Sequence, residues 1–291
     1  MMKIDGKATS LEIQEELRIQ TTALLSNGKR APHLAAIIVG DNPASRVYVG
    51  HKIKACERIG FDSTLIELDD NVTQVELLEQ IDGLNSSPDI DGFIVQLPLP
   101  QHLDELAVIR AIDPDKDVDG FHPINAGRLS LGLDGYAPAT PAGVMELIRR
   151  YGIETSGKKA VVVGRSHIVG TPMTVLLSRP GVDATVTLCH SRTVDLQDEV
   201  RRADIVVAAV GRAGFITKDM VKPGAVIIDV GINRIEDATR KSGTRLVGDV
   251  DPAAAEIASA MTPVPGGVGP MTIAALLMNT MKAYEHHHAG Q

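Results

Sequence analysis

The sequence predicts an α/β fold of two domains, each built around a parallel sheet. Apolar segments of strand length, such as HLAAIIVG at 33–40, alternate with amphipathic helical segments along most of the chain. These strands lack the strict polar alternation of a sheet with one solvated face, so helices should cover both faces. The alternation is interrupted once, by a Gly- and Pro-rich stretch near 125–140, and 291 residues are about two domains' worth.

In the first half, Thr9 and Glu12 form a capping-box pattern that predicts the start of a helix, which should end at 27–28. A second capping box, Thr73 with Glu76, predicts another helix start. The other elements expected in this half are helices at 45–59 and 103–112 and strands at 33–40, 63–68 and 92–99.

In the second half, Thr140 and Pro141 predict the N-cap and the first residue of a helix. The elements expected after it are strands at 159–164, 184–190, 204–211, 225–232 and 245–250, and helices at 170–179, 196–203 and 251–261. A rigid loop at 263–270 should precede a final helix at 271–284. This restart of the alternation predicts the second domain.

Composition excludes several classes of partner. The net charge is −8 and no Lys/Arg-rich run occurs, which argues against a nucleic-acid partner. The two cysteines, Cys56 and Cys189, are too few and too far apart for a disulfide framework or a zinc site. No segment has the apolar character of a signal peptide or a membrane span. We therefore expect a cytoplasmic protein without a nucleic-acid, membrane or metal partner.

A strand–turn–helix segment at 161–173, VVVGRSHIVGTPM, carries the strongest sign of a ligand. Gly164 stands where the strand ends and Gly170 where the helix begins. Glycine lets the backbone approach a pyrophosphate, and the helix N-terminus offers free N–H groups. The spacing differs from the usual G-x-G-x-x-G, and glycines in such turns also serve packing, so the turn alone leaves nucleotide binding open.

The end of the next strand indicates which nucleotide would fit. In a dinucleotide site, an acidic residue there binds the ribose 2′-hydroxyl of NAD, whereas an arginine accommodates the 2′-phosphate of NADP. This strand ends in Ser191 and Arg192 with no acid, and Arg165 stands in the first turn. These residues favour NADP over NAD, although a solvated loop of ordinary polar residues would look the same.

Tyr48 and Lys52 are four residues apart on the helix expected at 45–59 and so share a face, whereas Lys54 should be solvated. A lysine beside a partly desolvated ring is suited to acid–base chemistry. The alternative is an ordinary amphipathic helix whose lysine extends its ammonium group to water.

Two further polar positions stand near expected strand ends. Gln96 is a polar residue late in an apolar strand, and functional groups of open α/β sheets gather at the carboxyl ends of strands. The run DKDVDG supplies Asp117 and Asp119 in a loop. Asx turns account for most such aspartates, but a carboxylate there could also bind the N–H groups of a ligand.

The order of the motifs separates two families. Short-chain dehydrogenases also combine Tyr-x-x-x-Lys with a nucleotide-binding turn, but there the turn precedes the pair, and here Lys52 precedes Gly164. The chain instead closely resembles the bifunctional methylenetetrahydrofolate dehydrogenase/cyclohydrolase family. The matching segments, in the family's order, are SRVYVGHKIKA (45–55), DGFIVQLPLP (91–100), DKDVDGFHPINAGRL (115–129), TPAGVMELI (140–148), VVVGRSHIVGTPM (161–173), TLCHSRT (187–193), DIVVAAVG (204–211), IIDVGIN (227–233) and TPVPGGVGPMT (262–272).

The resemblance implies roles for individual residues. Lys52 is similar to the family's catalytic lysine, Gln96 to the glutamine that hydrogen-bonds it, and Tyr48 to the aromatic residue that stacks on the pterin. The residues implied to contact the folate are Tyr48, Ser45, Asp119, Pro265, Gly266, Gly267 and Val268. Those implied to bind NADP are Gly164, Arg165, Ser166, Ser191, Arg192 and Ile232.

The resemblance also implies an architecture. It comprises a discontinuous catalytic, folate-binding domain at 1–138 plus 274–291 and a Rossmann-like NADP-binding domain at 139–273, with the active site in the cleft between them. A homodimer through the cofactor domain is implied as well. The hairpin region at 234–246 carries no functional expectation.

The activity that the resemblance implies is bifunctional. 5,10-Methylenetetrahydrofolate would be oxidised with NADP+ to 5,10-methenyltetrahydrofolate, which would then be hydrolysed to 10-formyltetrahydrofolate. The alternatives are a dehydrogenase-only relative and a non-catalytic protein that binds folate or NADP. Lys52 argues against the first alternative, and the intact Lys52, Gln96 and Gly164–Ser166 turn argue against the second.

Overall fold

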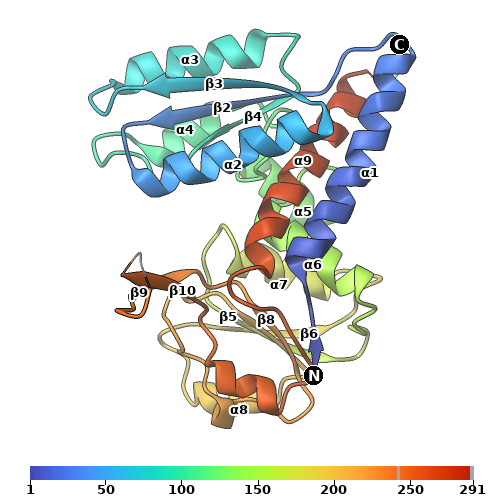
Figure 1. Cartoon of the computed structure of the whole chain (residues 1–291), viewed down its shortest axis with the longest axis vertical. Helices are drawn as coiled ribbons and strands as arrows, with labels where there is room; N and C mark the ends of the chain where they lie inside the picture. The colour runs from blue at the N-terminus through green and yellow to red at the C-terminus, as the bar shows by residue number, and fades with distance from the viewer. Residues whose placement is uncertain (241–242, 289–291) are drawn as a thin grey trace. The chain divides into compact units, whose positions relative to one another are not determined.

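The computed structural model describes residues 1–240 and 243–288. The chain divides into two compact units, and the predicted α/β class with parallel sheets is confirmed in both (Figure 1). Unit 1 comprises Met1–Ser10 and Thr140–Thr272, and unit 2 comprises Leu11–Ala139 and Ile273–Gln291, of which the last three residues lie outside the described part.

Unit 2 contains a three-stranded parallel sheet in the order β3-β2-β4. Its strands are β2 (His33–Val39), β3 (Asp62–Leu68) and β4 (Gly92–Val95). Its helices are α1 (Gly6–Ser26, in this unit from Leu11), α2 (Pro43–Ile59), α3 (Gln74–Ser86), α4 (Glu105–Ala111), α5 (Pro123–Leu131) and α9 (Val268–His287, in this unit from Ile273).

Both faces of this sheet are covered, as the unbroken apolar strands predict. Ala35, Ile37 and Val39 of β2 pack in one cluster with buried residues of α3 and α4. The residues between them are buried as well, and α2 lies on the opposite side of the sheet from α3 (Figure 1). The carboxyl ends of β2 and β4 therefore emerge from a rigid apolar layer.

Unit 1 contains a six-stranded parallel sheet in the order β1-β11-β8-β7-β5-β6. Its strands are β1 (Met2–Lys3), β5 (Lys159–Val163), β6 (Thr185–Cys189), β7 (Ile205–Ala208), β8 (Val226–Asp229) and β11 (Ala260–Met261). Around them stand α6 (Ala139–Arg150), α7 (Gly170–Ser178), α8 (Leu196–Arg201) and the 3-10 turns η1 (Lys218–Met220) and η2 (Pro252–Glu256). β9 (Asn233–Glu236) and β10 (Thr244–Val247) form a separate antiparallel hairpin.

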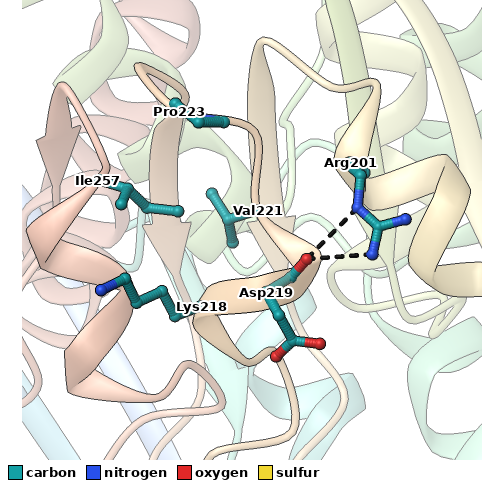
Figure 2. A pocket seen from close by; sticks show the side chains of 6 residues that line it. All are labelled: Arg201, Lys218, Asp219, Val221, Pro223 and Ile257. Carbon is teal, nitrogen blue, oxygen red and sulfur yellow. Dashed lines mark hydrogen bonds between the residues drawn. The ribbon is translucent and has the colours of Figure 1, made fainter.

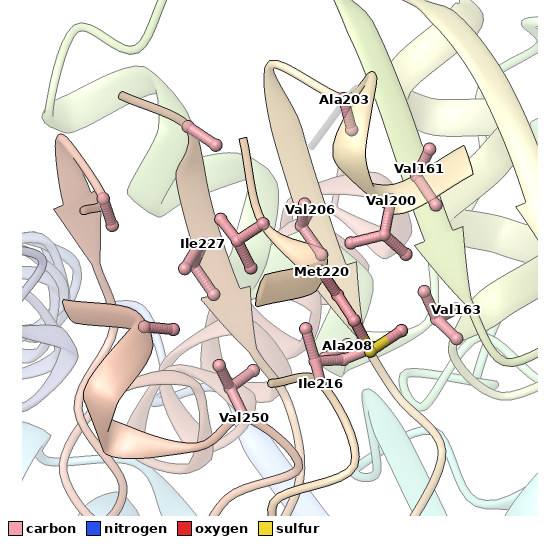
Figure 3. Close-up of a cluster of buried hydrophobic side chains, with 14 of the residues drawn as sticks. Val161, Val163, Val200, Ala203, Val206, Ala208, Ile216, Met220, Ile227 and Val250 are labelled. Carbon is pink, nitrogen blue, oxygen red and sulfur yellow. The ribbon is translucent and has the colours of Figure 1, made fainter. Parts of the chain in front are cut away.

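One face of the unit 1 sheet packs into a cluster of buried aliphatic side chains (Figure 3). Alternate residues of β5, β7 and β8, such as Val163, Val206 and Ile227, point into it and meet Val200 of α8 and Met220 of η1. The scarcity of aromatic residues, 3% of the chain, makes this core almost wholly aliphatic.

The structure corrects the predicted N-terminus. α1 begins at Gly6, so Thr9 lies inside the helix and donates its hydroxyl to the Asp5 carbonyl at 3.0 Å. Asp5 Oδ1 accepts the Ala8 N–H at 3.1 Å, which makes Asp5 the residue that caps the first turn. β1 pairs with β11, and the first ten residues belong to compact unit 1.

Other boundaries also differ from the prediction. α5 lies mostly in the Gly- and Pro-rich stretch for which the sequence predicts no helix, and the segment predicted as a helix at 251–261 is η2 followed by β11. β4 stops at Val95, so the rest of the strand expected at 92–99 is an exit loop. α9 begins at Val268, three residues earlier than expected. Residues 241–242 of the expected hairpin region lie outside the described residues.

Candidate active site

Helix α2 presents Lys52 from its buried face. Asn42 caps the helix by accepting the Ala44 N–H at 2.9 Å, and Pro43 occupies the first turn. Lys52 is only 7% exposed, whereas Tyr48, one turn earlier, is 39% exposed. Lys54 is exposed, as the sequence predicts. A buried ammonium group needs polar partners, so the surroundings of Lys52 decide what it can do.

Gln96 provides that partner. β4 ends one residue before it, and the Gln96 N–H continues the ladder by donating to the Ile37 carbonyl at 2.9 Å. The side-chain Nε2 donates to the Leu97 carbonyl at 2.8 Å, which turns Oε1 toward Lys52. Oε1 accepts from Lys52 Nζ at 3.2 Å, so the contact expected between these two residues is present. Nζ is thereby fixed in place and keeps two further N–H groups.

The DKDVDG loop lies along β4. Phe93 of β4 donates its N–H to the Lys116 carbonyl at 3.0 Å and forms a parallel bridge with Asp117. Directly after this bridge the chain turns, since the Gly120 N–H donates to the Asp117 carbonyl at 3.0 Å, and Asp119 stands in that turn. Within the described residues the Asp119 carboxylate has no protein hydrogen bond or ion pair, and Asp119 is partly exposed. Its carboxylate is available to a ligand.

Asp117 has a different environment from Asp119. It is 1% exposed and accepts hydrogen bonds from the His122 N–H at 2.8 Å and from Asn125 Nδ2 at 2.9 Å. Burial raises the pKa of its carboxyl to about 6, against the effect of these hydrogen bonds. Asp117 therefore shapes the loop from inside, while Asp119 faces outward from the same loop.

Ser45 is 6% exposed in the first turn of α2, where its N–H donates to Asn42 Oδ1 at 3.3 Å. Ser45, Tyr48, Lys52, Gln96 and Asp119 all belong to unit 2. Pro265, Gly266, Gly267 and Val268 belong to unit 1, where the Lys7 N–H donates to the Gly266 carbonyl at 2.9 Å.

In unit 1, the expected nucleotide turn joins β5 to α7. A Cβ on Gly164 would come within 2.0 Å of the Ala209 carbonyl oxygen, and one on Gly170 within 1.9 Å of the Gly164 oxygen. Only glycine permits this close approach of backbones. At the start of α7, Ser166 Oγ accepts the Val169 N–H at 3.1 Å and the Ser166 carbonyl accepts the Thr171 N–H at 2.9 Å. Arg165 and Ser166 are exposed in the turn, so their side chains are accessible to an anion there.

The end of β6 lies beside this turn, because β5 and β6 are neighbours in register up to Val163 and Cys189. The His190 N–H donates to Thr193 Oγ1 at 2.8 Å, which closes a tight turn with Ser191 and Arg192 exposed on it. Arg165 and Ser191 each stand two residues beyond their strands, at the same carboxyl edge. Ile232 follows β8 at this edge and is 45% exposed.

Two buried carboxylates at this edge escaped the sequence analysis. Asp229 is 2% exposed and Asp249 0% exposed, and both accept backbone N–H groups. The sequence carries one sign of these buried carboxylates, a glycine close to each aspartate. A side chain at Gly231 or Gly248 would collide with a carboxylate, so both positions require glycine.

A cavity of about 590 Å³ also lies in unit 1, lined by Arg201, Lys218, Asp219, Val221, Pro223 and Ile257 (Figure 2). These residues stand in the connections that lead into β7, β8 and β11, at the amino ends of the strands. Ligand sites of open α/β sheets form at the carboxyl ends, so this cavity is not the candidate site.

Within the described residues, no group of three or more His, Cys, Asp or Glu side chains is placed to hold a metal ion. No helix in 1–240 and 243–288 is long and apolar enough to cross a membrane. Cys56 and Cys189 are both buried and free, and burial raises the pKa of the Cys56 thiol to about 12.

Comparison with known families decides the relationship. Residues 4–119 match the catalytic domain, and residues 138–288 the NAD(P)-binding domain, of tetrahydrofolate dehydrogenase/cyclohydrolase. The chain belongs to this family. The bifunctional protein FolD of Cytophaga hutchinsonii is 56% identical over 287 residues, which are 97% of this chain and 99% of that protein.

Solved structures agree with this family assignment. The FolD methylenetetrahydrofolate dehydrogenase/cyclohydrolase of Campylobacter jejuni is 48% identical, with a TM-score of 0.93 over 98% of this chain and 99% of that one. The enzyme of Trypanosoma brucei, solved with NADP cofactor and an inhibitor, is 41% identical, with a TM-score of 0.93 over 98% of both chains.

The residues of this family member fit NADP. The absence of side chains at Gly164 and Gly170 leaves a backbone surface in the turn before α7 that a pyrophosphate can approach. Arg165, Ser191 and Arg192 provide cationic and hydroxyl groups where a 2′-phosphate would need them, and no carboxylate is among them.

Proposed function

We propose that this protein is a bifunctional one-carbon enzyme. It oxidises 5,10-methylenetetrahydrofolate to 5,10-methenyltetrahydrofolate with NADP+, and then hydrolyses the product to 10-formyltetrahydrofolate. The observation that carries the proposal is the buried Lys52, hydrogen-bonded to Gln96 at 3.2 Å, in a member of this family. A folate-binding protein without hydrolytic chemistry has no need of a buried lysine fixed in this way.

The dehydrogenase step relies on orientation. NADP+, when bound, accepts a hydride from the bridging carbon of the folate, and the folate's own nitrogen lone pairs stabilise the cation that results. The protein then has to hold the bridging carbon of the folate and the nicotinamide ring in the relative orientation that hydride transfer requires. We assign Tyr48 to stacking on the pterin and Asp119 to its N–H groups, because Tyr48 is exposed on α2 and the Asp119 carboxylate has no protein partner in the described chain.

The cyclohydrolase step needs proton transfer. Water adds to the methenyl carbon and loses one proton, which gives a neutral intermediate with a hydroxyl group on that carbon. The bond from the carbon to N5 then breaks as the hydroxyl gives up its proton and N5 gains one, so N5 ends as N–H and the formyl group stays on N10. We assign these proton movements to Lys52 Nζ. Gln96 fixes the position of Nζ through the hydrogen bond that its own contact with Leu97 orients.

We assign the cofactor contacts to unit 1 and the folate contacts mainly to unit 2. Gly164 and Ser166 would lie against the pyrophosphate, Arg165, Ser191 and Arg192 would bind the 2′-phosphate, and Ile232 would lie against the nicotinamide ribose. In unit 1, the loop Pro265, Gly266, Gly267 and Val268 would border the folate.

We also propose that the protein is cytoplasmic and forms a homodimer through unit 1. The two free cysteines suit a reducing compartment. The family resemblance supports the dimer. Light scattering should give about twice the chain mass of 31.0 kDa; a mass of one chain at micromolar concentration would contradict the dimer.

The experiment follows one sample by absorbance in the presence of methylenetetrahydrofolate and either NADP+ or NAD+. The proposal predicts NADPH at 340 nm with NADP+, followed by loss of the methenyl absorbance as 10-formyltetrahydrofolate forms. Reduced cofactor with stable methenyltetrahydrofolate would identify a dehydrogenase-only enzyme. No reaction with either cofactor would leave a binding protein.

A further inference from the structure

The carboxylate of Asp249 binds the exits of two neighbouring strands in unit 1. Asp249 is 0% exposed. It accepts N–H groups from Val210 at 2.6 Å, Gly211 at 2.9 Å and Arg212 at 2.9 Å. It also accepts from Asn233 Nδ2 at 2.8 Å. Three successive N–H groups that converge in this way form an anion-binding nest, and here the anion is a side chain of the protein.

Asp229 fixes the backbone that carries Asp249. At the end of β8, its Oδ1 accepts the Asp249 N–H at 2.9 Å and the Gly231 N–H at 3.0 Å, and its Oδ2 accepts the Val250 N–H at 3.0 Å. The space for both carboxylates depends on glycine. A Cβ on Gly231 would lie 2.3 Å from Asp249 Cγ, and one on Gly248 would lie 1.8 Å from Asp229 Oδ2.

The segments held by Asp249 lie where the sheet reverses its order. The chain passes from β5 to β6 on one side and then returns to β7 on the other side of β5. A dinucleotide binds across the carboxyl edge at such a switch point, one half on each side. The Gly164 turn and the β6 exit form one side, and residues 209–212 after β7 and 230–233 after β8 form the other.

Asp249 therefore contacts only the side away from Ser191 and Arg192. Its four hydrogen bonds join the β7 exit to Asn233, the residue next to Ile232. This is a rigid arrangement, because each N–H has one acceptor and the carboxylate is buried.

We propose that Asp249 is a positioning residue for the nicotinamide half of the cofactor, which it serves by holding the exits of β7 and β8 in one geometry. This inference rests on the proposed function, since it concerns the cofactor that the dehydrogenase uses. It assigns no contact between Asp249 and the cofactor itself.

The test replaces Asp249 by Asn and measures three quantities on the intact protein. In Asp249→Asn, one amide oxygen remains to accept, and the NH2 group faces N–H donors, so the exits should shift. We expect the dehydrogenase kcat/KM for NADP+ to fall roughly tenfold or more. Affinity for adenosine 2′,5′-bisphosphate, a probe without nicotinamide, and cyclohydrolase activity on added methenyltetrahydrofolate should stay within about twofold.

Asp204→Asn is the matched control. Asp204 stands just before β7, at the opposite end of the strand, and likewise accepts a backbone N–H, from Lys159 at 3.0 Å. The Asp204→Asn variant should leave all three measured quantities near their wild-type values. Asn233→Ala removes a single donor to Asp249 and should reproduce part of the dehydrogenase loss, which keeps the inference testable if Asp249→Asn does not fold.

Wild-type assays separate this inference from the proposed function. If the wild-type protein shows both activities and Asp249→Asn and Asn233→Ala keep normal dehydrogenase kinetics, the inference is overturned and the function stands. Equal loss of bisphosphate binding would also overturn it, because that result indicates general damage to unit 1. A wild type without NADP-dependent turnover would overturn the function first.

Discussion

Lys52 and Lys54 show how much two lysines on one helix can differ. Lys52 is 7% exposed and bonded to Gln96, whereas Lys54 is exposed. Asp117 and Asp119 form a similar contrast in one loop, the first fully bonded inside the protein and the second without a protein partner in the described chain. At the residue scale, burial and hydrogen bonding fix one group for chemistry at Lys52 and one group for the fold at Asp117, and they leave the Asp119 carboxylate for a ligand.

Asp119 should bind substrate without taking part in proton chemistry. Asp119→Ala removes a carboxylate that we assign to two pterin N–H groups, a loss of roughly 2–5 kcal/mol in binding. The KM for folate should rise in both reactions together, measured with methylenetetrahydrofolate and with methenyltetrahydrofolate. A variant that keeps normal dehydrogenase kinetics but loses hydrolysis would show that the assignment is wrong.

Arg165 should select NADP over NAD. Arg165→Ala removes a charge-assisted contact to the 2′-phosphate, so the KM for NADP+ should rise by roughly tenfold or more while that for NAD+ changes little. Steady-state kinetics with both cofactors measure this. Parallel increases for NADP+ and NAD+ would place Arg165 outside the 2′-phosphate site.

At the element scale, the carboxyl ends of strands and the turns after them carry the site. Two capping patterns of the same form, Thr73 with Glu76 and Thr9 with Glu12, had different outcomes. Thr73 forms the complete capping box, whereas Asp5 already caps α1 one turn before Thr9. Local pattern alone cannot decide between two good caps that lie within one turn of each other.

α5 was missed for a related reason. Its N-cap is His122, whose Nδ1 accepts the Ile124 N–H at 3.1 Å, and its C-cap is the left-handed Gly132. Proline at the first position and glycine after the end are helix signals, but the surrounding Gly/Pro-rich sequence favoured a loop. The position of Gln96 at a strand end could be predicted from the sequence pattern, and its pairing with Lys52 from the family resemblance. The contact between Asp229 and the Asp249 backbone could not, because it depends on how the chain returns after β10.

Gly164 should tolerate no side chain. It has a φ of 115°, and an added Cβ would come within 2.0 Å of the Ala209 oxygen. Gly164→Ala should displace the turn and weaken NADP binding by at least roughly 1–3 kcal/mol, measured by fluorescence titration. Gly181 has a φ of 86° with nothing within 4 Å of an added Cβ, so Gly181→Ala is a matched control for backbone strain alone. Equal affinity in both variants would contradict this account of the turn.

The loop that carries Asp119 should be sensitive to pH through Asp117. Burial raises the pKa of Asp117 from 3.8 to about 6, so the folded state holds its proton more tightly than the unfolded state. The stability that this provides is present below pH ~4 and is lost as the pH rises through about 6. As the pH rises from about 4 to above 6, the free energy of unfolding of Asp117→Asn should therefore increase relative to that of wild type, by up to about 3 kcal/mol.

Thermal unfolding of wild type and Asp117→Asn from about pH 4 to 7.5 measures the difference. The amide also loses hydrogen bonds to His122 and Asn125, which gives an offset that does not change with pH. Burial also raises the pKa of Asp229 to about 6. Asp229 is present in both proteins, so its contribution cancels in the stability difference. If the stability difference between wild type and Asp117→Asn stayed constant over this pH range, that result would contradict the raised pKa of Asp117.

At the scale of the whole molecule, two parallel-sheet units carry separable parts of the chemistry. Unit 1 holds the glycine turn and the groups suited to a 2′-phosphate, and unit 2 holds Lys52, Gln96 and Asp119. The α/β class of both could be predicted from apolar strands alone. The assignment of the first ten residues to unit 1 could not, since β1 has only two residues and pairs with β11, near the other end of the chain.

The most direct test of this account is Lys52→Met, which keeps the aliphatic stem and removes the amine. Both activities are measured with methylenetetrahydrofolate and NADP+, beside Lys54→Met as the control on the same helix. We predict that Lys52→Met still produces NADPH, though at a reduced rate, and accumulates methenyltetrahydrofolate because hydrolysis is abolished, whereas Lys54→Met behaves as wild type. Exposed substitutions seldom change stability or function by more than about 0.5 kcal/mol. Hydrolysis by Lys52→Met within a few-fold of wild type would contradict the assignment of Lys52 to the cyclohydrolase.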